Sequence, residues 1–295
     1  MSAPGAAELF AASRTRASAA EMAARLDALA AIVEEIQPCS VRQVFYQAVV
    51  RGVVGKTEAE YEKVQRALVR LRREQIVPYG WIADGTRWRI KPTTFSSLEQ
   101  ALARAAQFYR RALWDSADVY MEIWLEKDAL SGVVHPVTEE YDVGLHVARG
   151  FSSLSFLAES ADDIAAIGKP AFIYHLGDHD PSDRNAGEAI ERTLRELAPD
   201  AEIHFERLAV TLEQIAHLNL PLRPTKHSDS RAARFEAEYG QGSVELDAIH
   251  PDTLRAIVRE AIERHVDFRQ LEVLQEAEKS ERQILEVFAQ DRRDR

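Results

Sequence analysis

The sequence predicts an α/β protein in which a small, helix-rich part precedes a mainly parallel sheet and a set of C-terminal helices. Apolar residues recur at helical spacing over residues 19–74, whereas short apolar runs alternate with helical stretches over residues 119–210. From residue 251 onward the spacing is helical again. Alternation of strands and helices is typical of a parallel sheet covered by helices.

The first part of the chain is expected to contain three helices and a hairpin. Apolar spacing and break signals predict helices over residues 19–36, 41–50 and 57–74. Residues 76–90 are typical of two short strands joined by an Asp-Gly turn. Three helices followed by a β-hairpin describe a winged-helix module.

The third of these helices separates its residues by type, because apolar and basic side chains recur on different sides at the same 3–4–3 spacing. A solvated basic face is the ordinary interpretation of such a helix taken alone. The last helix of a winged-helix module commonly enters the major groove, and that position favours DNA binding. The apolar set is Tyr61, Val64, Leu68 and Leu71, and the basic set is Lys63, Arg66, Arg70 and Arg73.

The second part is expected to form the sheet. Parallel sheets of this kind bind ligands beyond the carboxyl ends of their strands. A linking helix precedes the strands, and one or two amphipathic helices follow them. The strand candidates are residues 119–125, 142–148, 170–176 and 202–210, the helices between them 153–165 and 183–197, the linking helix 98–113 and the tail 251–292.

Composition and charge limit the class of protein. Hydrophobic residues make up 46% and charged residues 29%, which excludes a disordered or collagen-like chain. One cysteine excludes an internal disulfide framework, and no apolar run is long enough for a membrane span, so a cytoplasmic protein without membrane contact is expected. The net charge of −11 is uneven: residues 1–115 carry 17 Lys and Arg against 12 Asp and Glu, and the remainder 20 against 36. The basic end is the one expected to face a polyanion.

Carboxylates follow two of the predicted strands. Glu126 comes directly after the first strand, and Asp178 and Asp180 come after the third. Side chains two apart in an extended segment share a face, so the two aspartates point the same way, and Glu126 meets them if the first and third strands are neighbours. Three oxygen donors of this kind suit Mg²⁺ or Mn²⁺.

Other interpretations of these residues stay open. An Asp-x-Asp in a loop is often turn chemistry, and an Asp before a helix is often a cap. His175 and His179 raise a rival, a His/Asp dimetal hydrolase, although the further histidine motifs of metallophosphoesterases are missing from the sequence.

The order of these motifs resembles a known family. A strand followed by Glu126, and a later strand ending in Asp178-x-Asp180-Pro, is similar to the Toprim domain of topoisomerases, primases and related nucleases. The upstream SVRQVFYQAVV (40–50) resembles a motif in the DNA-cleaving A-type subunit of topoisomerase VI, in which a winged helix carries the cleaving tyrosine. RLAVTLEQIAHLNLP (207–221) is similar to the segment that follows the acidic pair. The chain most resembles the minimal Topo mini-A proteins of mobile elements.

The resemblance implies a type IIB topoisomerase-like enzyme that cleaves double-stranded DNA with Mg²⁺ or Mn²⁺ held by Glu126, Asp178 and Asp180. Tyr46 would form a 5′-phosphotyrosyl link and leave a free 3′-hydroxyl. A homodimer in which each tyrosine works with the metal of the partner's Toprim part would cut both strands. A prokaryotic, phage or plasmid origin is implied. The family commonly has two adjacent tyrosines where this chain has Phe45-Tyr46, and ARGFSSLSF (148–156) matches the family's glycine-containing segment only loosely.

Helical geometry gives Tyr46 a partner. Arg42 lies one turn earlier and reaches the same site, where its guanidinium would stabilise the phenolate or hold the scissile phosphate. Both residues are expected to lie off the buried side of their helix. That buried side consists of Val41, Val44, Phe45 and Ala48.

Two alternatives to the topoisomerase-like function remain: a Toprim nuclease that uses water as the nucleophile, and a non-catalytic DNA-binding or assembly protein. The sequence has no G-x-x-x-x-G-K-[ST] motif, so no ATP site is expected in this chain. ATP-driven strand passage would need a separate ATPase partner, and ATP-independent relaxation or simple cleavage is expected. The predicted parts are an arm (1–19), the winged helix (20–95), the linking helix (96–116), the Toprim part (117–250) and the C-terminal helices (251–295).

Overall fold

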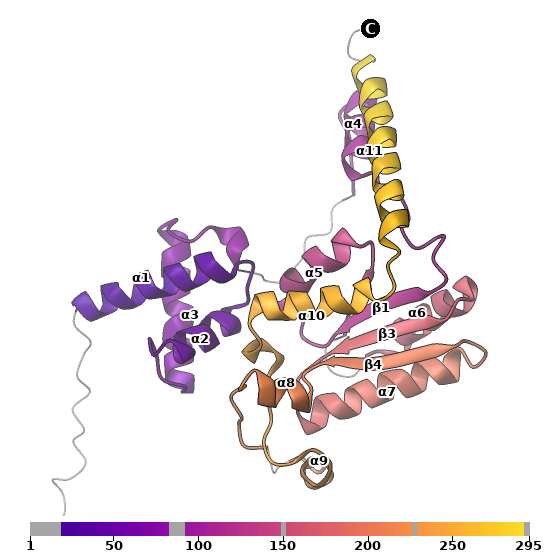
Figure 1. The fold of residues 1–295 in the computed structure, drawn as a ribbon. Coiled ribbons are helices and arrows are strands. Elements are labelled where there is room, and N and C mark those ends of the chain that lie inside the picture. The colour runs from indigo at the N-terminus through magenta and orange to yellow at the C-terminus, as the bar shows by residue number, and fades with distance from the viewer. Residues whose placement is uncertain (1–18, 83–91, 149–151, 226–228, 292–295) are drawn as a thin grey trace, which may run out of the picture.

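Helices and one parallel sheet make up the computed structural model (Figure 1). An N-terminal group of helices lies beside the sheet, and two further helices extend away from it. The turn and second strand of the hairpin expected over residues 76–90, and part of the segment 148–156, lie outside the described residues. The first strand expected there is wrong, because residues 79–81 form a 3₁₀ turn and Ile82 makes only an isolated bridge to Cys39. The structure describes residues 19–82, 92–148, 152–225 and 229–291.

The three N-terminal helices follow the local signals of the sequence and confirm the three predicted helices. They are α1 (Ala19–Ile36), α2 (Val41–Val50) and α3 (Glu58–Arg73). Ser40 caps α2 by accepting the backbone N–H of Gln43, and the Gln43 side chain caps Ser40 in return. Thr57 caps α3 by accepting the backbone N–H of Glu60.

One apolar core joins these helices. Leu29 and Ile32 of α1 are buried against Val44 of α2 and Leu68 of α3. After a single 3₁₀ turn, η1 (Tyr79–Trp81), the chain returns to this core. The apolar side predicted for α3 is confirmed, because Val64, Leu68 and Leu71 are buried and Tyr61 packs against the same core.

The four predicted strands form one sheet, with ends within two residues of those expected. All neighbours are parallel, in the order β2-β1-β3-β4. The first and third strands are therefore adjacent, as the grouping of the acids requires. The strands are β1 (Tyr120–Leu125), β2 (Gly144–Val147), β3 (Ala171–Leu176) and β4 (Ile203–Ala209).

Helices cover both faces of this sheet (Figure 1). One face packs on α5 (Ser131–Glu140) and α10 (Pro251–Glu263), and the other on α6 (Leu154–Ile167) and α7 (Pro181–Leu197). Side chains alternate between the two cores, so Ile123 and Leu125 belong to the first and Trp124 to the second. The sheet is thus buried on both sides, as near-continuous apolar strands predict.

Two helices form an arm that extends from the sheet (Figure 1). They are α4 (Leu98–Phe108) and α11 (Phe268–Asp291). The hydroxyl of Tyr109 donates to Glu281 at 2.6 Å, which ties the end of α4 to α11. The linking helix predicted to reach Leu113 ends at Phe108, because Tyr109 is extended and its side chain bonds α11. The tail prediction is confirmed as two helices.

Several short elements escaped prediction. The helix α5 contains Pro136, which sequence rules count as a breaker. The short helix α8 (Leu212–His217) has a capping box between Thr211 and Gln214. The remaining elements are α9 (Ala232–Tyr239) and the 3₁₀ turns η2 (Asp128–Leu130) and η3 (Leu246–Ala248).

A close approach after β3 yields a test of this packing. A Cβ added at Gly177 would lie 2.0 Å from Oδ2 of Asp183, whereas one added at Gly187 in α7 would make ordinary contacts with His175 at 3.4 Å and Arg207 at 3.8 Å. Gly177→Ala is expected to lower the free energy of unfolding by roughly 1–3 kcal/mol through overpacking. Gly187→Ala should raise it by about 0.5–1 kcal/mol, because alanine favours the helix.

Urea unfolding of both variants beside the wild type measures the difference. Equal effects of the two substitutions, or a stable Gly177→Ala variant, would contradict the close contact with Asp183.

Candidate functional site

The carboxyl ends of β1 and β3 meet at one edge of the sheet. Leu125 pairs with Leu176, and the backbone N–H of Glu126 donates to the carbonyl of Leu176 at 3.0 Å. Glu126 therefore lies beside the turn that carries Asp178 and Asp180. The expected grouping of the three acids follows from this register, and the place where they meet is here called the acidic edge.

Glu126 is half-buried, and among the described residues no hydrogen bond or ion pair reaches its carboxylate. Burial, followed by the charges of Asp183 and Asp178, raises the pKa of Glu126 from 4.5 to about 7, while Lys127 acts in the opposite direction. Its side chain is therefore only partly ionised at neutral pH. Such a group is stabilised by any cation that reaches it.

Asp178 is held on two sides. Its Oδ1 accepts the backbone N–H of Leu246 at 2.8 Å, and Nζ of Lys127 lies 3.4 Å from each carboxylate oxygen. Burial raises the pKa of Asp178, and Lys127 and the Leu246 N–H act in the opposite direction. The carboxylate is thus fixed in position by a backbone donor and a lysine.

Asp180 is the N-cap of α7. Its Oδ1 accepts the backbone N–H groups of Ser182 and Asp183, both at 2.8 Å, so the capping interpretation of this residue is confirmed. Its Oδ2 accepts no hydrogen bond from any described residue. Capping occupies one oxygen and leaves the other at the acidic edge.

Sequence reasoning missed a fourth acid, Asp183. It is buried in the first turn of α7, and its Oδ2 accepts from Nη2 of Arg207 at 2.7 Å, whereas Oδ1 has no partner among the described residues. Burial raises the pKa of Asp183 to about 6 although Arg207 opposes the change. Acidic residues are common in the first turn of a helix, where they interact favourably with the helix dipole, so the sequence provided no reason to assign Asp183 to the site.

Carboxylate oxygens are suitable ligands for a hard divalent cation, but the carboxylates of the acidic edge are not arranged around a common point. Within the described ranges, no group of three or more His, Cys, Asp or Glu side chains is arranged to hold a metal ion. Lys127 occupies one side of Asp178, and the cap uses one oxygen of Asp180. The orphaned Oδ1 of Asp183 and the unpaired carboxylate of Glu126 are the oxygens with unmet charge, and oxygen donors suit Mg²⁺ or Mn²⁺.

The two histidines have other surroundings. His175 is buried and stacks on Phe205, and burial lowers its pKa to about 3. His179 packs against Phe235, and burial lowers its pKa to about 4. Both are packed against aromatic rings, which gives the dimetal-hydrolase alternative no support.

Tyr46 projects from α2 toward the sheet part of the molecule. Its side chain is 2% exposed, so the expectation that it lies off the buried side of its helix is wrong. It is absent from the N-terminal core and is covered instead by residues from elsewhere: Arg223 lies 5.6 Å from its ring centre and Lys56 5.9 Å. The second part of the chain buries it, which a helical pattern could not reveal.

Tyr46 and Arg42, the two site residues predicted on α2, both contact the carboxylate of Glu245. The Tyr46 hydroxyl donates to Oε2 of Glu245 at 3.2 Å, and Nη1 of Arg42 lies 3.5 Å from the same oxygen. Arg223 forms an ion pair with Oε1 of Glu245. The prediction that Arg42 and Tyr46 reach one place is confirmed, but a carboxylate occupies that place.

Residues 245–247, here called the connector, link this tyrosine to the acidic edge. Glu245 binds Tyr46, and the next backbone N–H, that of Leu246, binds Asp178. Asp247 is buried and accepts from Oγ of Ser40 at 2.7 Å and from Nζ of Lys127 at 2.6 Å. Sequence reasoning missed the connector. The sequence pattern that could have indicated it is a pair of acidic residues, Glu245 and Asp247, that follows two glycines.

The basic face of α3 is exposed as predicted. Lys63 pairs with Glu60, and Arg70 with Glu74 at 2.8 Å. Arg66 and Arg73 form no ion pair with any residue that the structure describes.

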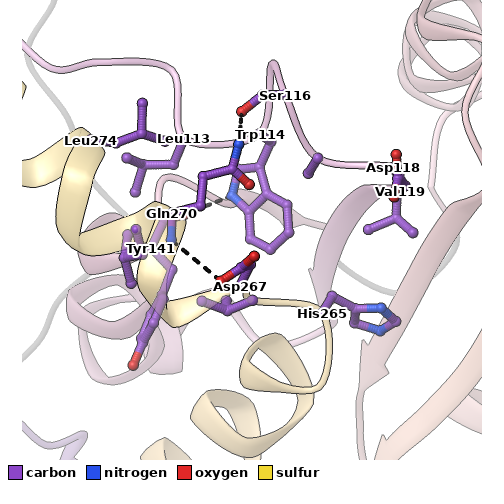
Figure 2. Close-up of a pocket in the computed structure, with 13 residues that line it drawn as sticks. Leu113, Trp114, Ser116, Asp118, Val119, Tyr141, His265, Asp267, Gln270 and Leu274 are labelled. Atoms are coloured by element: carbon purple, nitrogen blue, oxygen red, sulfur yellow. Dashed lines mark hydrogen bonds between the residues drawn. The ribbon is translucent and has the colours of Figure 1, made fainter.

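A separate cavity of about 320 Å³ lies at the opposite end of the sheet, where the chain enters β1 (Figure 2). Trp114 and Gln270 line it, and Gln270 donates to Ser116 at 2.7 Å. Val119, just before β1, also lines it, whereas Glu126 follows β1. This cavity takes no part in the acidic edge.

Comparisons with known proteins add no relative: no family model matches the chain, and no curated protein does. In the part of the chain that the structure describes, every helix is too short or too polar to cross a membrane.

The pKa of Glu126 yields a stability prediction. The pKa of Glu126 in the folded protein lies above the ordinary 4.5, so protonated Glu126 contributes to the free energy of unfolding. That contribution is fully present below pH 4.5 and is lost as the pH rises through about 7. In a chelator at pH 8, Glu126→Gln should be more stable than the wild type by up to roughly 3 kcal/mol. At pH 4.5 the two should be equal.

Urea unfolding at both pH values, with EDTA or with Mg²⁺, measures this difference. Mg²⁺ should stabilise the wild type at pH 8 and have little effect on Glu126→Gln. A substitution that destabilised the protein equally at both pH values would contradict the unmet charge of Glu126.

Proposed function

We propose that this protein is a metal-dependent DNA-cleaving enzyme, similar in organisation to the DNA-cleaving A-type subunit of topoisomerase VI, with Tyr46 as the nucleophile. The main support for this proposal is the connector, in which Glu245 accepts a hydrogen bond from the Tyr46 hydroxyl and the next residue donates its backbone N–H to Asp178. A nucleophile candidate and an acidic edge, far apart in sequence, thus belong to one network. Metal-assisted attack by a tyrosine on a phosphodiester would use both the tyrosine and the acidic edge.

The arrangement of elements supports a winged helix followed by a Toprim part. Three helices with an exposed basic face precede a parallel sheet whose neighbouring strands β1 and β3 end in Glu126 and the Asp178–Asp180 turn. In open parallel sheets, ligands bind beyond these carboxyl ends. The β-hairpin wing remains part of the proposal, because residues 83–91 lie outside the described residues.

The chemistry would divide between the two parts. When bound, Mg²⁺ or Mn²⁺ would polarise the phosphate and stabilise charge on the leaving oxygen. Glu126, Asp178, Asp180 and the newly found Asp183 would hold it, which requires Lys127 to withdraw from Asp178. Tyr46 would bond the 5′-phosphate and release a 3′-hydroxyl.

Substrate access requires a change around Tyr46. Arg42 and Arg223 enclose its hydroxyl together with Glu245, so a phosphate reaches the hydroxyl only when the two arginines move away from Glu245. Arg42 and Arg223 would then be free to hold the phosphate by charge-assisted hydrogen bonds. The connector links Tyr46 to the acids of its own chain, so the proposal places each site within one copy instead of between two copies as the resemblance implies. Two such sites in a homodimer would cut both strands, and strand passage driven by ATP would need a separate ATPase.

One observation favours the second candidate, a metal nuclease that uses water. Tyr46 is 2% exposed, and burial followed by the charge of Glu245 raises its pKa well above 10. In that mechanism the acidic edge acts alone, and Tyr46 packs between the two parts of the chain.

Covalent capture separates the two mechanisms. Wild-type protein incubated with supercoiled plasmid and Mg²⁺, then denatured with detergent, should yield DNA ends linked to protein. Tyr46→Phe should abolish these ends and lower cleavage at least 100-fold, because the nucleophile is lost. Glu126→Gln should abolish both cleavage and linkage.

Gel analysis of relaxed, nicked and linear plasmid, with and without ATP, is the measurement. Cleavage by Tyr46→Phe at the wild-type rate would favour the water-dependent nuclease. Failure of the wild type to cut under any of these conditions would favour a DNA-binding protein.

The exposed basic face predicts how binding depends on salt. Replacing Arg66 and Arg73 by alanine removes two cations without ion-pair partners among the described residues, so the slope of log affinity against log salt should fall by about 2. As a control, alanine at Arg192 and Arg195 removes two exposed cations from α7 and should leave the slope unchanged. Fluorescence anisotropy with labelled duplex DNA measures both.

Equal slopes for the two double variants would exclude the basic face of α3 from the DNA interface.

A further inference from the structure

We infer that Glu245 is the general base for Tyr46 and that Arg223 positions it; this inference rests on the proposed DNA cleavage. The Tyr46 hydroxyl donates to Oε2 of Glu245 at 3.2 Å, within the range over which a base takes a proton from its nucleophile. Arg223 binds the other oxygen, Oε1. A nucleophile, a base and a group that orients the base are thus joined by consecutive contacts.

Glu245 is the acceptor that the surroundings leave for this proton. The other groups around the phenol are cations: Arg42 beside the shared oxygen, and Arg223 and Lys56 over the ring. The nearby carboxylate of Asp247 is already occupied by Ser40 and Lys127. Among the described residues, Glu245 is the hydrogen-bond partner of the Tyr46 hydroxyl.

The backbone holds this carboxylate in register with the acidic edge. Val244 and His179 exchange both backbone hydrogen bonds, at 2.8 and 3.0 Å, so Glu245 follows directly on a bridge to the residue between Asp178 and Asp180. A second bridge joins Arg223 to Ser243 at 2.8 and 2.9 Å. Base and orienting arginine therefore come from segments pinned to each other and to the acids.

The environment of Tyr46 explains why a base is required. Burial raises the pKa of Tyr46, and the charge of Glu245 raises it further, so the phenol keeps its proton until a phosphate arrives. Transfer of the proton during attack avoids a free buried phenolate. Transfer also neutralises Glu245, which then no longer competes with the phosphate for Arg42 and Arg223.

The step balances without another reactant. The Tyr46 O–H bond breaks and its proton moves to Oε2 of Glu245, while the phenolic oxygen bonds phosphorus. The bond from phosphorus to the 3′ oxygen breaks, and that oxygen gains a proton from water. Glu245 later returns its proton to solvent.

Glu245→Gln tests the role, because glutamine keeps the shape but is a poor base. In single-turnover cleavage with Mg²⁺, the rate of protein–DNA linkage should fall about 100- to 10,000-fold. A matched control is Glu263→Gln, since Glu263 accepts from the Tyr141 hydroxyl beside Arg259 in a similar arrangement away from the acids. It should cleave at the wild-type rate.

Chemical rescue separates a base from a structural link. Formate added to Glu245→Ala should restore at least a tenth of the wild-type rate, because a small carboxylate can occupy the space and accept the proton. Circular dichroism melting of each variant shows whether it is folded under assay conditions.

Each outcome has a distinct meaning. If the wild type forms no Tyr46-linked DNA, the proposed function fails. If the wild type forms it and Glu245→Gln does so within threefold of the wild-type rate, the base role of Glu245 is overturned while the function stands. Slow cleavage by folded Glu245→Ala that formate does not raise also overturns the base role and leaves Glu245 as a structural contact.

Discussion

The connector is the contact on which the arrangement of the two parts depends. Its three residues bond Tyr46, Asp178, Ser40 and Lys127 through two carboxylates and one backbone N–H. Asp247 is buried, so its two hydrogen bonds offset the cost of removing a charge from water. Loss of Lys127 would leave the buried carboxylate without its cation, and loss of Ser40 would remove one of its two hydrogen bonds, which makes this junction sensitive to changes on both sides.

Charge is balanced only in part at the acidic edge. Four acids gather there, and the cations that reach them are Lys127, shared between Asp178 and Asp247, and Arg207, paired with Asp183. Glu126 and Asp180 form no ion pair with any described residue. Elsewhere the acidic excess is partly met by exposed pairs such as Arg259–Glu140, each of which contributes about 0–1 kcal/mol.

Local signals predicted the elements well and their contacts poorly. Apolar spacing and break signals gave helix starts that the structure confirms, with Ser40 and Thr57 as the caps, and apolar runs gave all four strands within two residues. The burial of Tyr46 was missed because the helix that carries it turns that face toward residues about 200 positions away. A helical pattern reports which side of a helix is apolar, and it is silent on which distant segment covers a polar side.

Taken alone, the sequence determined the α/β class, the order of the elements and the placement of Glu126, Asp178 and Asp180 after two strands, because hydrophobic periodicity and capping are local properties. The tertiary structure alone decided that β1 and β3 are neighbours, that Asp183 joins the acids, and that Glu245 receives both Tyr46 and Arg42. These contacts join residues 50 to 200 positions apart, and they form only when the packing of the sheet and the N-terminal helices has brought their backbones together.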